Sequence, residues 1–231
     1  MIDFARKRVL TFDCYGTLID WETGISAALQ PVLEAHGVSV PEDRLLELYA
    51  DLEAAAEGGP YRPYSEVLAA VVRGLGERLG FQATPAETAS LADSVGAWPA
   101  FPDSPPALAA LKRRYKLAII SNVDDALLAA SARRLGVELD WVITAQQVRS
   151  YKPSTRPFLV AIERIGLPQD HILHVAQSLF HDHVPAKGLG LDTVWVNRRH
   201  GKPGAGATPP ADARPDLEVP DLRTLAELAC G

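Results

Sequence analysis

Three stretches of this 231-residue sequence each lead from an apolar run into side chains that can perform nucleophilic or acid–base chemistry. These side chains are Asp13 and Thr17 after the first run, Ser121 and Asn122 after the second, and Gln177, Ser178 and Asp182 after the third. An acid at the carboxyl end of a buried strand, followed by a glycine turn, is where open α/β sheets place their ligands. Taken alone, Asp13 before Gly16 is equally consistent with an ordinary turn. The repetition at three strand ends favours one shared polar site.

The elements that must position these groups alternate between strand and helix. Short apolar runs predict strands at residues 8–13, 116–122, 141–144, 172–176 and 193–196. Helical spacing predicts helices at residues 105–114, 126–135, 157–165 and 221–229, with another around Ala186 and Lys187. This order is typical of an α/β protein with a doubly wound parallel sheet. Residues 200–220 are rich in Pro, Gly and Ala without a period, and predict an extended loop.

Between the first strand and the rest lies a segment with only helical periodicity. Leu45, Leu48 and Leu52 form one apolar stripe of several, and Thr84-Pro85 has the form of a helix start. We therefore predict a core domain made of residues 1–17 and 100–231, and a helical cap domain of residues 18–99.

The first motif resembles that of a known superfamily. Asp13-x-Tyr15-Gly16-Thr17-Leu18 after a hydrophobic strand is similar to the first motif of the haloacid dehalogenase (HAD) superfamily. The later polar stretches follow in the order of its other motifs, and Lys152 in Ser150-Tyr151-Lys152-Pro153 corresponds to its lysine motif. The resemblance implies a Rossmann-like HAD core with an inserted cap, and a nucleophilic Asp13 that forms a covalent ester.

Two departures indicate a particular branch. HAD phosphatases carry a second Asp where this chain has Tyr15, and an acid where it has Gln177. Asp13 and Asp182 facing Lys152 give an excess of one negative charge, and a Gln carbonyl is a weak substitute for a carboxylate on Mg²⁺. Tyr15 and the poor metal shell resemble the L-2-haloacid dehalogenase branch, which uses no cofactor. We expect no metal and no cofactor.

The resemblance implies a mechanism in two steps. Ionised Asp13, favoured by Lys152, attacks the carbon that bears the halogen. Thr17 and Ser121 are expected to hydrogen-bond the nucleophile or the substrate carboxylate, and Asn122 to donate to the leaving halide. Asp182 then activates the water that hydrolyses the ester, or only anchors Lys152.

Part of the branch's pattern is missing. Its halide-binding Arg lies on the second cap helix, and around Tyr49-Ala50-Asp51 there is none. We name Arg62 as the replacement from the cap, to be tested. Tyr15, Gln177 and Ser178 complete the expected substrate-binding set. His181 and His183 flank Asp182, but their spacing sends them to different sides of a helix, so we expect no histidine-bound metal.

Composition restricts the partners. The net charge of −6 argues against nucleic acid, and no apolar run approaches the ~20 residues that span a bilayer. Without a signal-type segment at the start and with two cysteines, the chain is expected to be cytoplasmic. We expect a small anionic organic acid as substrate and, by resemblance, a homodimer.

The sequence thus predicts a hydrolase that dehalogenates short 2-haloacids through an aspartyl ester. The alternatives are a Mg²⁺-dependent phosphatase acting on a small phosphate ester, and a non-catalytic binding module that kept the HAD fold. The natural substrate and the leaving halide stay open.

Overall fold

The core of the protein is a parallel sheet. The computed structural model describes residues 2–202 and 204–231. Six strands pair in the order β3-β2-β1-β4-β5-β6, each parallel to its neighbours. Their bounds are β1 Val9–Phe12, β2 Lys116–Ser121, β3 Trp141–Thr144, β4 Ile172–Ala176, β5 Asp192–Val196 and β6 Leu217–Val219. The predicted α/β fold with a doubly wound parallel sheet is confirmed.

Strand β6 corrects the prediction of a loop over residues 200–220. It has only three residues and adds to the edge of the sheet beside β5, with Glu218 opposite Trp195. Leu217, Glu218 and Val219 do alternate between apolar and polar, but three residues are too few to distinguish a strand from a loop. The pairing of β6 to β5 therefore depends on the tertiary fold.

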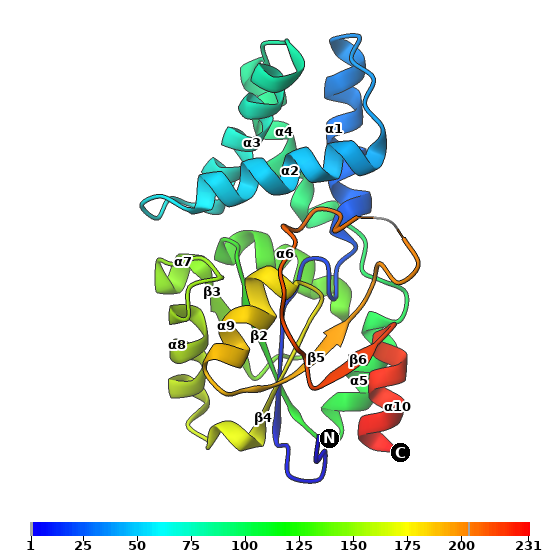
Figure 1. Cartoon of the computed structure of the whole chain (residues 1–231), viewed down its shortest axis with the longest axis vertical. Coiled ribbons are helices and arrows are strands. Elements are labelled where there is room, and N and C mark those ends of the chain that lie inside the picture. Colours follow the sequence, from blue (N-terminus) through cyan, green and yellow to red (C-terminus); the bar gives the residue numbers. More distant parts are fainter. Residues whose placement is uncertain (1, 203) are drawn as a thin grey trace.

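Helices cover both faces of the sheet (Figure 1). Their bounds are α5 Ser104–Lys112, α6 Asp125–Leu135, α7 Ala145–Val148, α8 Arg156–Ile165, α9 Val184–Gly188 and α10 Leu222–Cys230. Successive residues of β1 point to opposite faces, so that Leu10 and Phe12 join one apolar core and Val9 joins another with Phe158. Burying the sheet on both faces leaves only its ends free for polar side chains.

A second layer, which we call the cap, lies over the carboxyl end of the sheet (Figure 1). It consists of α1 Trp21–Ala35, α2 Glu42–Glu57, α3 Tyr64–Leu79 and α4 Pro85–Ser94. Within the described residues, the segment 18–99 contributes no strand to the sheet. Thr84 and Glu87 close a reciprocal capping box at the start of α4, as the Thr-Pro signal predicts.

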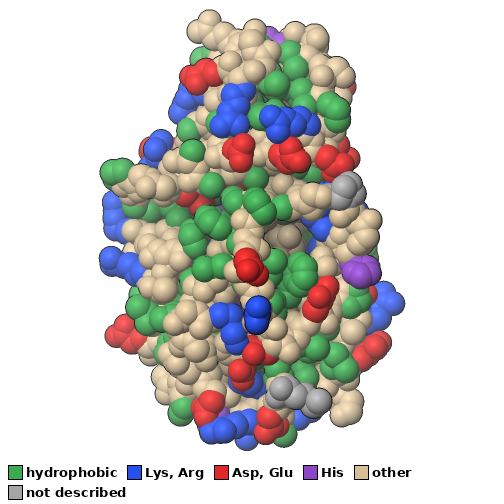
Figure 2. Space-filling view, viewed as in Figure 1, with side chains coloured by type: hydrophobic (Ala, Val, Ile, Leu, Met, Phe, Trp, Pro, Cys, Tyr) green, Lys and Arg blue, Asp and Glu red, His purple; other side chains and the backbone are tan. Residues whose placement is uncertain are grey.

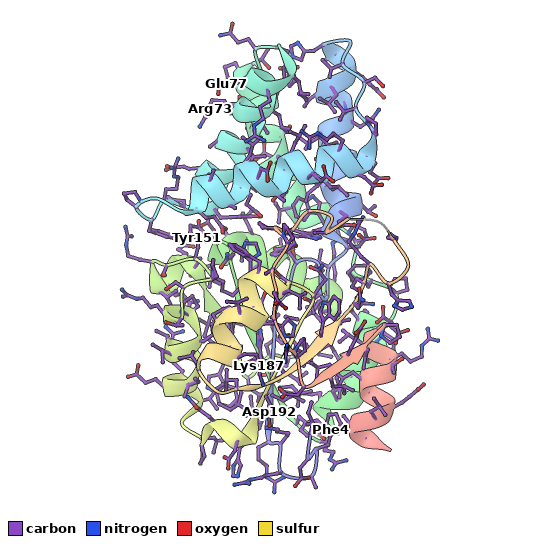
Figure 3. The ribbon with its side chains drawn as sticks, in the orientation of Figure 1. Phe4, Arg73, Glu77, Tyr151, Lys187 and Asp192 are labelled. Carbon is purple, nitrogen blue, oxygen red and sulfur yellow. The ribbon has the colours of Figure 1, made fainter. Side chains whose placement is uncertain are left out.

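Two antiparallel segments connect the cap to the core. Ile19 forms a bridge to Ala100, Asp20 N donates to Pro99 O at 2.8 Å, and Phe101 N donates to Leu18 O at 3.0 Å. The cap also contacts the core at the loop after α7. There the Tyr151 hydroxyl donates to Arg62 O at 2.8 Å, and Figure 3 shows Tyr151 where the two layers meet.

The surface is mixed in charge. On the face in Figure 2, Lys and Arg side chains are interspersed with Asp and Glu, and no single basic surface stands out. Among the helices of residues 2–202 and 204–231, none has the length and apolar character needed to cross a bilayer.

Candidate active site

The centre of the site is a buried lysine between two carboxylates. Lys152 Nζ donates to Asp13 Oδ1 at 2.9 Å, to Asp182 Oδ1 at 2.7 Å and to Ile120 O at 3.0 Å. Its side chain is only 1% exposed. Burial opposes the ammonium charge, but the two carboxylates outweigh it and raise the pKa of Lys152 above its usual value. The lysine is therefore a fixed cation at the ends of β1, β2 and β4.

Asp13 is held on both oxygens. Oδ1 accepts from Lys152, and Oδ2 accepts from the Thr17 hydroxyl at 2.6 Å. Thr17 Oγ1 accepts in turn from Gln177 N at 2.9 Å, which fixes the direction of its proton. Burial raises the pKa of the Asp13 carboxyl despite Lys152, and the negative Asp182 adds to the effect. The Asp13 carboxyl group is therefore fixed in position and poorly hydrated.

The turn after Asp13 requires a glycine. Gly16 has φ +88°, and a Cβ there would lie 2.8 Å from Trp21 Nε1. This close approach brings Trp21, the first residue of α1, to the cavity that Asp13 also lines.

Asp182 belongs to a chain of hydrogen bonds inside the core. Its Oδ1 faces both Lys152 Nζ and His174 Nε2, the latter at 3.0 Å, and His174 Nδ1 lies 2.9 Å from Thr11 Oγ1. Burial works against ionisation of Asp182, but Lys152 and His174 hold its pKa well below its usual range. Its Oδ2 is buried and has no hydrogen-bond partner among the described residues. One oxygen of a carboxylate that is ionised at neutral pH is thus left for a ligand or water.

Asn122 holds the lysine in place. Its Oδ1 accepts from Lys152 N at 2.7 Å, and its Nδ2 donates to Lys152 O at 2.9 Å. The second Nδ2 hydrogen points to Glu57, with an Oε2 distance of 3.1 Å. Both donors are in use, so Asn122 fixes the Lys152 backbone and has no free hydrogen for a leaving halide, contrary to the expected role.

Three other residues expected at the site differ in how their polar atoms are used. The Tyr15 ring lines the site, but its hydroxyl lies 2.9 Å from Ser131 Oγ on α6. Ser121 Oγ is buried at the cavity without a partner among the described residues. Ser178 Oγ accepts from His181 N at 2.9 Å.

Two expected substrate-binding side chains lie elsewhere. Gln177 Oε1 is 3.4 Å from the Thr208 hydroxyl, in a neighbouring hollow. Arg62 is half-buried at the connection between α2 and α3 and does not line the cavity. Arg62 precedes Pro63, the residue before α3, and its backbone carbonyl accepts from the Tyr151 hydroxyl.

A magnesium ion does not fit this arrangement. Lys152 Nζ already ion-pairs with the facing oxygens of Asp13 and Asp182, and Gln177, a neutral amide, does not line the cavity that holds Asp13. Among the residues that the structure describes, no three His, Cys, Asp or Glu side chains come together as metal ligands.

The cap adds two carboxylates that the sequence prediction omitted. Glu53 and Glu57 lie on α2 and reach the same cavity as Asp13. Leu45, Tyr49, Glu53 and Glu57 follow at intervals of four, so the two acids continue the apolar stripe of this helix. That continuation was the available signal. The excess of one negative charge that we expected from the sequence therefore included only core residues and left out these two acids of the cap.

We call the enclosed space the central cavity. It has a volume of about 30 Å³, enough for about two water molecules. Its cap side is formed by Trp21, Glu53, Glu57 and Tyr64. An outer cleft of about 410 Å³ shares Glu57 and Lys152 with it, so Glu57 lies between the cavity and solvent.

Burial dominates the titration of the groups around this cavity. It raises the pKa of Glu53 to about 7 and that of Glu57 well above its usual value. It lowers the pKa of His181 to about 4, so that this imidazole is neutral at pH 7. His181 Nε2 has no hydrogen-bond partner among the described residues and lies 3.9 Å from Glu57 Oε2.

Fold and site together define a doubly wound α/β protein with a buried carboxylate–lysine centre under a helical cap. The family model of haloacid dehalogenase-like hydrolases matches residues 7–178. The chain belongs to this family and is a hydrolase, which confirms the resemblance found in the motifs.

Curated relatives and solved structures agree with this placement. The chain is 27% identical to an (S)-2-haloacid dehalogenase of Pseudomonas fluorescens, over 94% of this chain and 93% of that one. It is 32% identical to another from Pseudomonas sp. (strain YL), over 55% of this chain and only 54% of that protein's length. A crystal structure of an L-2-haloacid dehalogenase superposes with TM-score 0.77 at 26% identity, covering 97% of this chain and all of the other.

Proposed function

We propose that this hydrolase cleaves the carbon–halogen bond of short 2-haloacids or their close derivatives, through an ester formed on Asp13 and without a metal. The observation that carries the proposal is the doubly held carboxylate: Lys152 on Oδ1 and Thr17 on Oδ2. Relatives with dehalogenase names over nearly the whole chain support the choice of bond.

The first step needs no proton transfer. A carboxylate oxygen of Asp13 forms a bond to the carbon that carries the halogen, and the carbon–halogen bond breaks with its electron pair leaving as halide. The Lys152 ammonium favours the ionised form of Asp13 against the effect of burial, and Thr17 restricts the rotation of the carboxylate. Neither contact has to be broken for the attack.

The second step regenerates Asp13. Water attacks the ester carbonyl, the developing oxyanion lies beside the Lys152 ammonium, and the alcohol product leaves with an oxygen that came from Asp13. The unpartnered Asp182 Oδ2 is the group placed to accept the water proton. Asp182 also anchors Lys152, so its two roles must be separated by experiment.

The test is a single turnover in ¹⁸O-water with enzyme in excess over (S)-2-chloropropionate and 2-chloropropionamide. Label is expected in Asp13 and not in the first product. Asp13→Asn should lose halide release by on the order of 10⁴–10⁶-fold. If Asp182 is the base, Asp182→Asn should accumulate the ester, because such assistance is worth roughly 10²–10⁴-fold.

Two outcomes would contradict the scheme. Label that appears directly in the first product would exclude the ester. Slow ester formation in Asp182→Asn, without an adduct, would leave Asp182 as the anchor of Lys152 only. Phosphate release from phosphate esters, measured with and without EDTA, checks the phosphatase alternative, which Tyr15 and Gln177 in place of acids disfavour.

A further inference from the structure

The cap makes the central cavity acidic. Glu53 and Glu57 lie one turn apart on α2, over Asp13 and Asp182, and all four carboxyl groups line the cavity. Among the described lining residues, Lys152 is the only lysine or arginine. A site for an anionic substrate needs positive charge or free donors, and here the cap supplies carboxyl groups.

Glu53 is built into the cap. The Tyr49 hydroxyl donates to its Oε1 at 2.7 Å, and the Tyr64 hydroxyl makes a short bond to the same oxygen. Tyr49 is fully buried and packs edge-on against Trp21. These contacts hold the carboxyl group rigidly at the cavity wall, so it cannot swing aside for an incoming anion.

Glu57 is the carboxyl group nearest to free polar atoms. It accepts from Asn122, lies 3.9 Å from His181 Nε2, and separates the central cavity from the outer cleft. His181 Nε2 and Ser121 Oγ are buried at the same cavity and unpartnered among the described residues. Together with Asp182 Oδ2, these are the polar side-chain atoms at the cavity that the described residues leave for a ligand, and none of them carries positive charge at pH 7.

The charges of the core already leave an excess. Ionised Asp13 and Asp182 against Lys152 give one net negative charge before Glu53 and Glu57 are counted. A bound carboxylate adds a second in a cavity shielded from solvent. At a separation of about 6 Å and an effective dielectric of about 20, one such repulsion weakens binding on the order of a hundredfold.

We propose that Glu53 and Glu57 select a substrate whose group next to the halogenated carbon is a nitrogen donor, an amide or an ammonium, rather than a free carboxylate. Such a group donates to Glu57 and adds no negative charge. The reaction at the halogenated carbon rests on the proposed function, but the predicted preference for a nitrogen donor over a carboxylate in binding does not.

Binding of unreactive probes tests the selection directly. We would measure dissociation constants of propionamide, ethylammonium and propionate by calorimetry at pH 6 and pH 8.5. The wild-type protein should bind at least one nitrogen probe 10-fold or more tightly than propionate at both pH values. Ethylammonium as the preferred probe would identify an ammonium group, and propionamide an amide.

Two variants assign the effect. Because the raised pKa of Glu57 makes it ionise only as pH rises, Glu57→Gln should strengthen propionate binding and weaken ethylammonium binding more at pH 8.5 than at pH 6. Glu47→Gln removes a half-exposed acid from the same helix and should change neither. The proposal would be overturned if propionate bound as tightly as both nitrogen probes. This holds even if the equal binding is found only at pH 6, where protonated Glu53 and Glu57 can donate to an anion.

Turnover separates this inference from the proposed function. Halide release from (S)-2-chloropropionamide should exceed that from (S)-2-chloropropionate, with Asp13→Asn as the blank. If the free acid is turned over 10-fold faster, the selection is wrong and the dehalogenase proposal stands. If neither substrate releases halide while the order of probe binding holds, the dehalogenase proposal fails and the selection stands.

Discussion

Replacing Lys152 by methionine removes the cation from the centre of the site and keeps most of its volume. Lys152 Nζ is bonded to Asp13 at 2.9 Å and to Asp182 at 2.7 Å, and its side chain is 1% exposed. Lys152→Met leaves two buried carboxylates without their common partner. Breaking a buried ion pair in this way costs about 3–5 kcal/mol of unfolding free energy, which we expect for the variant at pH 8.

The loss should depend on pH in a defined direction. Without Lys152, the folded-state pKa of Asp13 rises further above its unfolded value of about 4. A carboxyl group with a raised folded-state pKa supports folding below its unfolded pKa and loses that contribution as pH rises through the folded pKa. The penalty of Lys152→Met should therefore be smaller at pH 5 than at pH 8.

Urea unfolding at both pH values measures the effect. The exposed Lys116, which pairs with Asp140 at 2.9 Å, supplies the control, and Lys116→Met should cost less than about 1 kcal/mol. Adding Asp13→Asn to Lys152→Met removes one of the two uncompensated charges and should restore about 1–3 kcal/mol. A cost below about 1 kcal/mol for Lys152→Met at pH 8, or a further loss on adding Asp13→Asn, would refute the charge argument.

Two further predictions concern the cap. The pKa of Glu53 is raised to about 7, so its contribution to stability is full below pH ~4.5 and is lost as pH rises towards 7. Glu53→Gln should remove up to about 3 kcal/mol of this pH dependence of the unfolding free energy, measured with urea. An unchanged dependence of the unfolding free energy on pH would contradict the raised pKa. A Cβ on Gly24 would lie 2.3 Å from the buried Trp98 ring, so Gly24→Ala should cost about 1–3 kcal/mol in thermal unfolding. Gly188→Ala on α9, where a Cβ meets nothing within 4 Å, is the control and should cost little; equal losses would refute the steric argument.

The sequence alone determined the core of the site. Asp13, Ser121 and Asp182 follow buried strands, and parallel strands bring their carboxyl ends to one edge. Each strand can be recognised from its own apolar run, so this prediction needs no knowledge of contacts between distant segments. Lys152 required knowledge of a family, and its bonds to both acids agree with the position that the resemblance implies.

The sequence was less informative wherever a contact depended on how distant segments dock. Arg62 is a cap residue of the right charge, but the chain direction before α3 places it outside the cavity. His174 lies within a strand, and only the pairing of β4 with β1 brings it to Thr11. Neither placement follows from periodicity, because periodicity gives the face of an element and not its neighbour.

The cap shows this limit most clearly. Four-residue spacing puts Glu53 and Glu57 on the same stripe of α2 as Tyr49, but this helix packs mainly against α3, and Glu57 reaches the core through Asn122. Which acids face Asp13 is decided by the angle at which the whole cap docks over the sheet. That angle depends on many contacts between segments far apart in the chain, so the acidity of the central cavity is visible only in the tertiary structure.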